Sequence, residues 1–130
     1  QRQMCIRDRF GTEPDHRPAV VLDWQGVIVS AGVQDVAYLL TQNLTIDDRR
    51  AHEAELLAYY HRRLVDLGVD GYSLEQLTAD YRLAALYLFI YAVVIGGTLD
   101  PSNERGLAFM AQLTDRACSA IVDLELLGLL

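Results

Sequence analysis

From Gln34 onward, apolar residues recur every three or four positions, and this spacing predicts helices. The first helix runs from Gln34 to Asn43. Thr45, followed by Asp48 three residues later, predicts the N-cap of a second helix, and Gly68 predicts its end. We expect the second helix to present Leu57, Tyr60, Leu64 and Leu67 to the core, and Asp47, Asp48, Arg49, Arg50, Glu53, Arg62 and Arg63 to solvent.

Two further helices follow. Ser73 and Gln76 form a capping box that starts the third helix, which carries 17 uncharged residues from Leu83 to Leu99. Because a membrane span needs about 20 apolar residues, we expect a fully buried core helix and no membrane partner. Asp100, as an N-cap before Pro101, predicts the start of the fourth helix. Its expected core positions are Leu107, Met110, Leu113, Ala117 and Ile121.

A different pattern precedes the helices. Turn-forming residues crowd positions 11–18, and the Val-rich run Ala19–Leu22 has the length of a strand. With Phe10 in a preceding strand, the segment predicts a short β-hairpin that ends at Asp23. The predicted fold class is therefore mainly α, with a short β-hairpin followed by about four helices.

Composition narrows the class of protein. The 130 residues are 52% apolar and 22% charged, which is typical of a single globular domain. Eighteen acids face 11 basic residues, all of them Arg, so the net charge is -7. This charge repels phosphate backbones and argues against a nucleic-acid partner. No secretory signal pattern is visible, and we expect a cytoplasmic protein.

Residues 1–9 differ from the rest of the chain. Their back-translation resembles a transposase adapter used in sequencing libraries, so we expect them to be translated adapter sequence. The natural sequence is then expected to be residues 10–130, one domain that retains a single thiol, Cys118. One thiol cannot form an internal disulfide, which fits a reducing cytoplasm.

Asp23 is the strongest candidate for chemistry. An ionised carboxylate at the end of a buried strand costs several kcal/mol unless a metal ion or several donors compensate for its desolvation. Asp35 follows twelve residues later, at the start of the first predicted helix. The plainer alternatives are a capped turn for Asp23 and an ordinary helix N-terminal acid for Asp35.

Two enzyme families place an Asp in such a position. The run Asp23-Trp24-Gln25-Gly26 resembles the nucleophile loop of the haloacid dehalogenase group. However, Gln25 stands where that family needs a general acid, and the chain has no Lys to balance a phosphate. A haloacid dehalogenase-like phosphatase is therefore the lesser alternative.

The second resemblance is broader. The run from Val20 to Trp24, followed by Gly32–Leu39, is similar to the C-lobe of the aminoglycoside phosphotransferase and choline kinase-like family, which has the protein-kinase fold. Tyr59-Tyr60-His61, Asp80-Tyr81-Arg82 and residues 124–130 are similar to its ecdysteroid kinase-like branch. The resemblance covers residues 10–130 and implies the C-terminal part of a protein-kinase-like C-lobe.

The resemblance also implies roles for individual residues. Asp23 would ligate the Mg²⁺ that bridges the phosphates of ATP, with Trp24 beside it, and Asp35 would accept hydrogen bonds from the backbone of the catalytic loop. The family's catalytic base Asp and metal-binding Asn are expected upstream of Phe10. The parent protein would phosphorylate the hydroxyl of a small molecule, whereas this fragment would be inactive.

A non-enzymatic function is the main alternative: a helical ligand-binding or dimerisation module. Tyr81, Tyr87 and Tyr91 recur at helical spacing and are expected in the core rather than in a substrate pocket. The kinase interpretation requires Asp23 at a strand end, within reach of the helix that begins near Asp35.

Overall fold

The computed structural model describes residues 29–100 and 102–130, and residues 31–130 form one compact unit. Its helices are α1 (Val33–Tyr38), the π-helix η2 (Leu39–Asn43), α2 (Ile46–Asp66), α3 (Leu74–Thr98), α4 (Glu104–Asp123) and the 3-10 helix η3 (Leu126–Leu129). No strand occurs in the described part, so the mainly α prediction is confirmed there. The hairpin predicted between Phe10 and Asp23, and the boundary at residue 9, lie outside the described residues.

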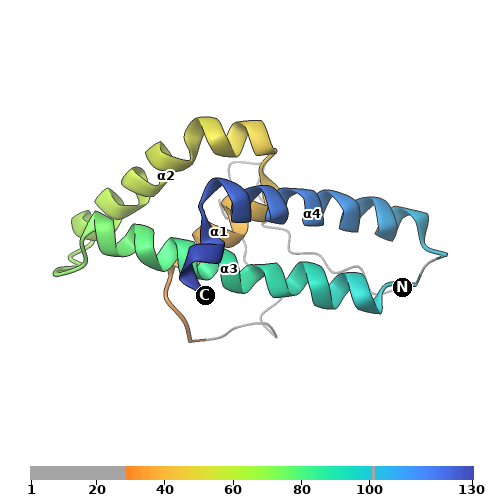
Figure 1. Cartoon of the computed structure of the whole chain (residues 1–130). Coiled ribbons are helices and arrows are strands. Elements are labelled where there is room, and N and C mark those ends of the chain that lie inside the picture. Colours follow the sequence, from red (N-terminus) through yellow and green to blue (C-terminus); the bar gives the residue numbers. More distant parts are fainter. Residues whose placement is uncertain (1–28, 101) are drawn as a thin grey trace, which may run out of the picture. The chain divides into compact units, whose positions relative to one another are not determined.

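The longest helix, α3, organises the unit. In Figure 1, α3 and α4 run side by side in opposite directions, and both α1 and α4 pack extensively against α3. The main core lies where α1, α2 and α3 meet, and it comprises Val33, Ala37, Leu40, Leu57, Leu77, Tyr81 and Leu88. A smaller cluster of Ala92, Met110 and Leu113 joins α3 to α4.

The first predicted helix, residues 34–43, is present but changes type midway. Its second half is the π-helix η2, closed by a hydrogen bond of 3.3 Å from the amide of Leu44 to the carbonyl of Leu39. This wider turn holds Gln42, which is 3% exposed and donates from Nε2 to the carbonyl of Leu88 at 2.9 Å. Helical spacing in the sequence predicts a helix here without distinguishing a π turn from an α turn.

The predicted start and end of α2 and the predicted start of α3 are confirmed. The amide of Asp48 donates to Thr45 Oγ1 at 3.1 Å, and the amide of Gln76 donates to Ser73 Oγ at 3.1 Å. Gly68 follows α2 with a φ of 88°, the left-handed conformation that glycine adopts most readily. Local side-chain chemistry therefore determines these helix ends.

The predicted start of α4 is wrong. Asn103, rather than Asp100, is the N-cap, and its Oδ1 accepts from the amide of Gly106 at 2.9 Å. The carboxylate of Asp100 instead accepts from the amide of Ser102 at 2.9 Å and from its hydroxyl at 2.8 Å. The two side chains accept from different amides: Asp100 satisfies a turn that precedes the helix, and Asn103 caps the helix itself.

The prediction of a fully buried third helix is also wrong. Only 22% of the most apolar 18-residue window of α3 is buried. The other described helices cover one side of α3, where Leu77, Tyr81, Ala85, Leu88 and Ala92 lie. By length and composition alone, α3 is long and apolar enough to cross a membrane. Core helices of soluble proteins meet the same criterion. The cytoplasmic location stays a prediction.

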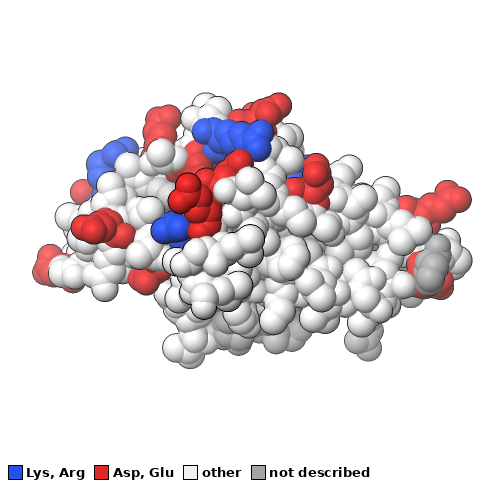
Figure 2. Space-filling model, viewed as in Figure 1, with Lys and Arg blue, Asp and Glu red and all other residues white. Residues whose placement is uncertain are grey.

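The other side of α3 is apolar, and on it Leu83, Tyr87, Ile90 and Val94 are each more than half exposed. Figure 2 shows an uncharged surface along α3 between its two ends, with the charged side chains gathered over α2 and near those ends. The prediction that Tyr87 and Tyr91 lie in the core is accordingly wrong, since both are exposed, while Tyr81 is buried as predicted.

The predictions for Leu67 and Arg49 are wrong. Leu67, predicted to lie in the core, follows the end of the helix and is 74% exposed. Arg49, predicted to face solvent, is 2% exposed, and its guanidinium contacts Glu53 at 3.2 Å and Asp123 of α4. The hydroxyl of Tyr81, from α3, donates to the same Glu53. One buried cation thus links three helices.

Neighbouring groups extend this contact. Arg50 binds Asp123 at 2.8 Å, and the hydroxyl of Ser119 donates to the same carboxylate at 3.2 Å. The described ion pairs between helices therefore meet where the first turns of α2 approach the last turns of α4. We call Arg49, Arg50, Glu53, Tyr81, Ser119 and Asp123 the Arg49 network.

Removing the central guanidinium should destabilise the fold strongly. Arg49→Ala leaves the carboxylate of Glu53 without its buried cation and removes one of the two arginines that bind Asp123. We expect a loss of about 3–5 kcal/mol in the free energy of unfolding, measured by urea denaturation. The matched change Arg62→Ala removes an exposed arginine of the same helix, whose described contact is with the ring of Tyr59, and should cost less than about 1 kcal/mol. Equal losses in both variants would contradict this account.

The Arg49 network should also weaken in acid. Hydrogen bonds from Arg50 lower the pKa of Asp123, and Arg49 lowers it further. Partial burial raises it, but by less, so the pKa stays well below its usual range. A carboxyl with a depressed folded-state pKa stabilises the fold above the ordinary Asp pKa of about 3.9, and this stabilisation is lost as the pH falls. The stability difference between wild type and Asp123→Asn should therefore shrink below about pH 4. A difference that stays constant down to about pH 2 would refute the assignment.

Candidate functional site

Asp35 lies in the first turn of α1, and its side chain is exposed. The predicted helix is present at this position, and an acid in the first turn is favourable toward the helix dipole. Gly32 is the N-cap and makes no side-chain capping bond. The position fits both an ordinary helix N-terminal acid and a residue that faces a neighbouring loop.

Tyr60 of α2 is a neighbour of Asp35 that the sequence does not reveal. Burial, and then the charge of Asp35, raise the pKa of the Tyr60 phenol. A Cβ added to Gly32 would lie 2.9 Å from the Tyr60 hydroxyl, so the phenol approaches the backbone at the start of α1 closely. The apolar spacing in α2 places Tyr60 toward the core, but no sequence pattern relates it to Asp35.

A second phenol extends the site. Tyr72, between α2 and α3, donates its hydroxyl to Asp80 of α3 at 2.8 Å, and His61 Nε2 contacts the Tyr72 carbonyl at 2.7 Å. Burial, the hydrogen bond to Asp80 and the charges of Asp80 and Tyr60 raise the pKa of Tyr72 to about 12. We call Asp35, Tyr60, Tyr72 and Asp80 the phenol cluster.

The phenol cluster supplies hydrogen-bonding groups from three helices and a loop. At neutral pH both phenols are protonated donors, and the carboxylate of Asp80 is an acceptor for one of them. The arrangement can therefore hold the start of α1 in place and present the Asp35 carboxylate outward. This is a supporting role and supplies neither a nucleophile nor a base.

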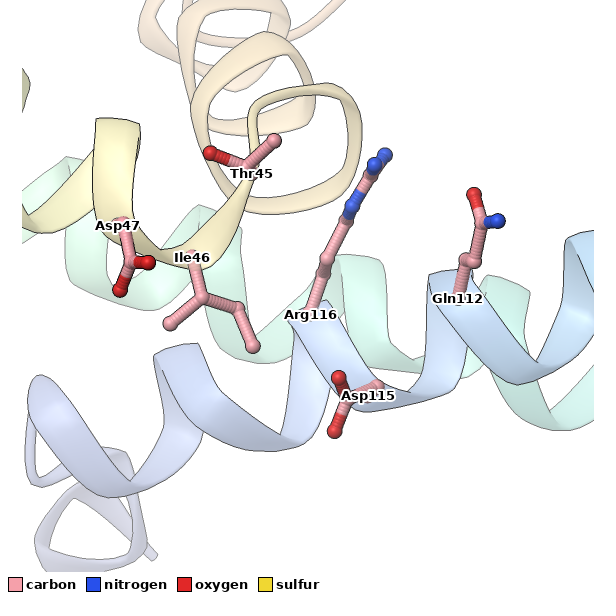
Figure 3. Close-up of a pocket in the computed structure, with 6 residues that line it drawn as sticks. All are labelled: Thr45, Ile46, Asp47, Gln112, Asp115 and Arg116. Atoms are coloured by element: carbon pink, nitrogen blue, oxygen red, sulfur yellow. The ribbon is translucent and has the colours of Figure 1, made fainter.

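A shallow pocket of about 230 Å³ lies elsewhere, between the start of α2 and α4. Figure 3 shows the side chain of Arg116 reaching from α4 toward the turn that precedes α2, away from Asp115. Arg116 Nη1 donates to the carbonyls of Gln42 at 3.0 Å and Asn43 at 3.3 Å. The arginine thus caps the end of η2 and is already engaged. The pocket is lined by Thr45, Ile46, Asp47, Gln112, Asp115 and Arg116.

The metal prediction rests on residues outside the described part of the chain. Asp23 and Trp24 both precede residue 29, so the structure neither joins them to Asp35 nor separates them from it. Within residues 29–100 and 102–130, no group of three or more His, Cys, Asp or Glu side chains could hold a metal ion. The Mg²⁺ role of Asp23 stays a prediction.

Comparison with known proteins gives a family match. The model of a family described as "Uncharacterized oxidoreductase dhs-27" matches residues 15–105, and this family is kinase-like. The match includes Asp23, Trp24 and Asp35, together with α1, α2 and α3. No curated protein and no solved structure matches the chain. The predicted kinase resemblance is thus confirmed at the level of a kinase-like family.

The phenol of Tyr72 should titrate late. With its pKa raised to about 12, Tyr72 should stay protonated at a pH where ordinary tyrosines, near 10, are largely ionised. A raised folded-state pKa stabilises the fold below the unfolded-state pKa, and the contribution is lost as the pH rises. Tyr72→Phe should therefore destabilise the fold at neutral pH and by less above about pH 10. Ultraviolet titration, with Tyr59→Phe as the exposed control, checks this, and a Tyr72 titration near 10 would contradict it.

Proposed function

The chain belongs to the family described as "Uncharacterized oxidoreductase dhs-27", and from this we propose that it is the C-terminal part of an ATP- and Mg²⁺-dependent small-molecule phosphotransferase. The observation that carries the proposal is the match of a kinase-like family over residues 15–105. That range contains Asp23-Trp24 and, twelve residues after Asp23, Asp35. The similarity of these motifs to aminoglycoside phosphotransferases and choline kinases, near the ecdysteroid kinase-like branch, supports the finer assignment.

We assign the two acids different roles. Asp23 holds Mg²⁺, which neutralises charge on the phosphates of ATP when it is bound. Asp35 accepts hydrogen bonds from the backbone of the catalytic loop and so keeps that loop in its active conformation, and Trp24, the next residue after the metal ligand, supports the site. The exposed position of Asp35 in the first turn of α1, where the Tyr60 hydroxyl approaches the backbone at Gly32, supports the second role.

In this proposal the other catalytic residues belong to the parent protein. The base Asp, which accepts the proton of the substrate hydroxyl, and a second metal ligand, Asn, lie upstream of Phe10. The acceptor is the hydroxyl of a small molecule, and the 130-residue chain alone transfers no phosphoryl group. The family description names an oxidoreductase, and an oxidation of reduced nicotinamide is the competing activity to be measured alongside.

The test uses the open reading frame extended upstream and expressed as the full-length parent. We expect ATP-dependent phosphorylation of a small-molecule alcohol, measured by ADP release across a panel of aminoglycosides, choline-like alcohols, sugars and steroids. Asp23→Asn should lower kcat by at least about 100-fold, because it removes a metal ligand that stabilises developing charge. Asp35→Asn should lower it by about 10–100-fold, the range for groups that orient an active site.

The matched control is Asp70→Asn, which changes an exposed acid in the connection between α2 and α3 and should leave kcat within about twofold. Three results would refute the proposal: no ATP-dependent transfer to any alcohol, oxidation of reduced nicotinamide in its place, or an Asp23→Asn variant as active as the control. Phosphoryl transfer by the purified 130-residue chain would refute the assignment of the base Asp and the metal-binding Asn to the part of the parent upstream of Phe10.

A further inference from the structure

Gly32, the N-cap of α1, has no space for a side chain. Its φ of -58° and ψ of -22° are right-handed helical values that any residue adopts, so the backbone conformation does not require glycine. A Cβ at this position would lie 2.9 Å from the hydroxyl oxygen of Tyr60. Non-bonded carbon atoms attract most at about 3.5–4.0 Å, so a Cβ here would press against the phenol. The phenol therefore occupies the space that a larger residue 32 would need.

Tyr60 is held in this position by the core. Its ring packs against the main core cluster, which includes Val33 and Ala37 of α1 and Leu57 of α2. A tyrosine side chain has only two torsion angles, so a packed ring leaves its hydroxyl oxygen little freedom. The packing of α2 thus determines where the oxygen meets the start of α1.

The backbone at Gly32 in turn determines where Asp35 points. The amide of Gln34 donates to the carbonyl of Ala31 at 2.9 Å, so α1 begins with a tight turn that contains Gly32. Residues three apart share one side of a helix, which places Asp35 on the same side as Gly32, one turn later. Burial, and then the charge of Asp35, raise the pKa of Tyr60, as a carboxylate near the phenol would. A shift of the Gly32 backbone therefore moves Asp35.

We propose that Tyr60 is a positioning residue of the phosphotransferase, because its hydroxyl lies against the backbone at Gly32 and so sets the direction of the Asp35 carboxylate. Tyr60 touches neither the substrate nor the metal ion in this proposal, and it acts only through Asp35. The proposal rests on the proposed function, in which Asp35 holds the catalytic loop.

The contact itself is tested in the 130-residue chain by urea denaturation. Gly32→Ala should raise the equilibrium constant for unfolding by at least about fivefold in the presence of Tyr60, and by less than about twofold in a Tyr60→Phe background. The reason is that Phe lacks the oxygen that the new Cβ would meet. An equal effect of Gly32→Ala in both backgrounds would overturn the proposal.

The neighbouring residue supplies a matched control. Tyr59 is 55% exposed, and its ring contacts Arg62 of the same helix. In a Tyr59→Phe background, Gly32→Ala should keep its full effect on unfolding, because the hydroxyl of Tyr60 is still present. Loss of the effect in this background would also overturn the proposal.

The role in catalysis is tested in the full-length parent. Tyr60→Phe should lower kcat by about 3–10-fold, because a displaced Asp35 holds the catalytic loop less well, and should leave the KM for ATP within about twofold. In an Asp35→Asn background, the same change should lower kcat by less than about twofold, because Tyr60 acts through Asp35. A merely structural role would give the same loss of kcat in both backgrounds. Tyr59→Phe should leave kcat within about twofold.

Failure of this proposal is distinguishable from failure of the proposed function. A parent that transfers no phosphoryl group overturns the proposed function and, with it, the catalytic role of Tyr60. A parent that transfers phosphoryl groups overturns the role of Tyr60 alone if Tyr60→Phe keeps the wild-type kcat, or if it loses kcat equally with and without the Asp35 carboxylate. The measurement of kcat does not use Gly32→Ala, so it does not depend on whether that variant folds.

Discussion

The buried guanidinium of Arg49 is the contact on which the arrangement of the helices depends. It is 2% exposed, and it reaches Glu53 on its own helix and Asp123 on α4, while Tyr81 of α3 binds the same Glu53. A buried cation without partners would cost several kcal/mol, so a packing that brings Glu53 and Asp123 to Arg49 is favoured over one that leaves it unpaired. The network therefore favours the observed packing of α2 against α3 and α4.

That packing places side chains of α2 against the start of α1. With α2 fixed at one end by the Arg49 network, Tyr60 lies against the backbone at Gly32 and near Asp35, and Tyr72 is tied to Asp80. The phenol cluster is thus a consequence of helix packing, and it supports the turn that presents Asp35.

The same packing leaves α3 with two different sides. Helices α1, α2 and α4 cover one side of α3, and Leu83, Tyr87, Ile90 and Val94 on its other side remain exposed. The uncharged residues 83–99 therefore belong to a helix that is buried on one side only, which the sequence pattern does not distinguish from a fully buried helix.

Residues a few positions apart suffice to predict the helices, the caps at Thr45 and Ser73, the stop at Gly68 and the position of Asp35 at a helix start. Contacts between distant parts of the chain bury Arg49, leave one side of α3 exposed and bring Tyr60 near the start of α1. Periodicity tells which residues share a side of a helix. It cannot tell which side a neighbouring helix covers, because that depends on contacts between residues far apart in the chain, and a charged residue is buried wherever such contacts supply its counter-charge.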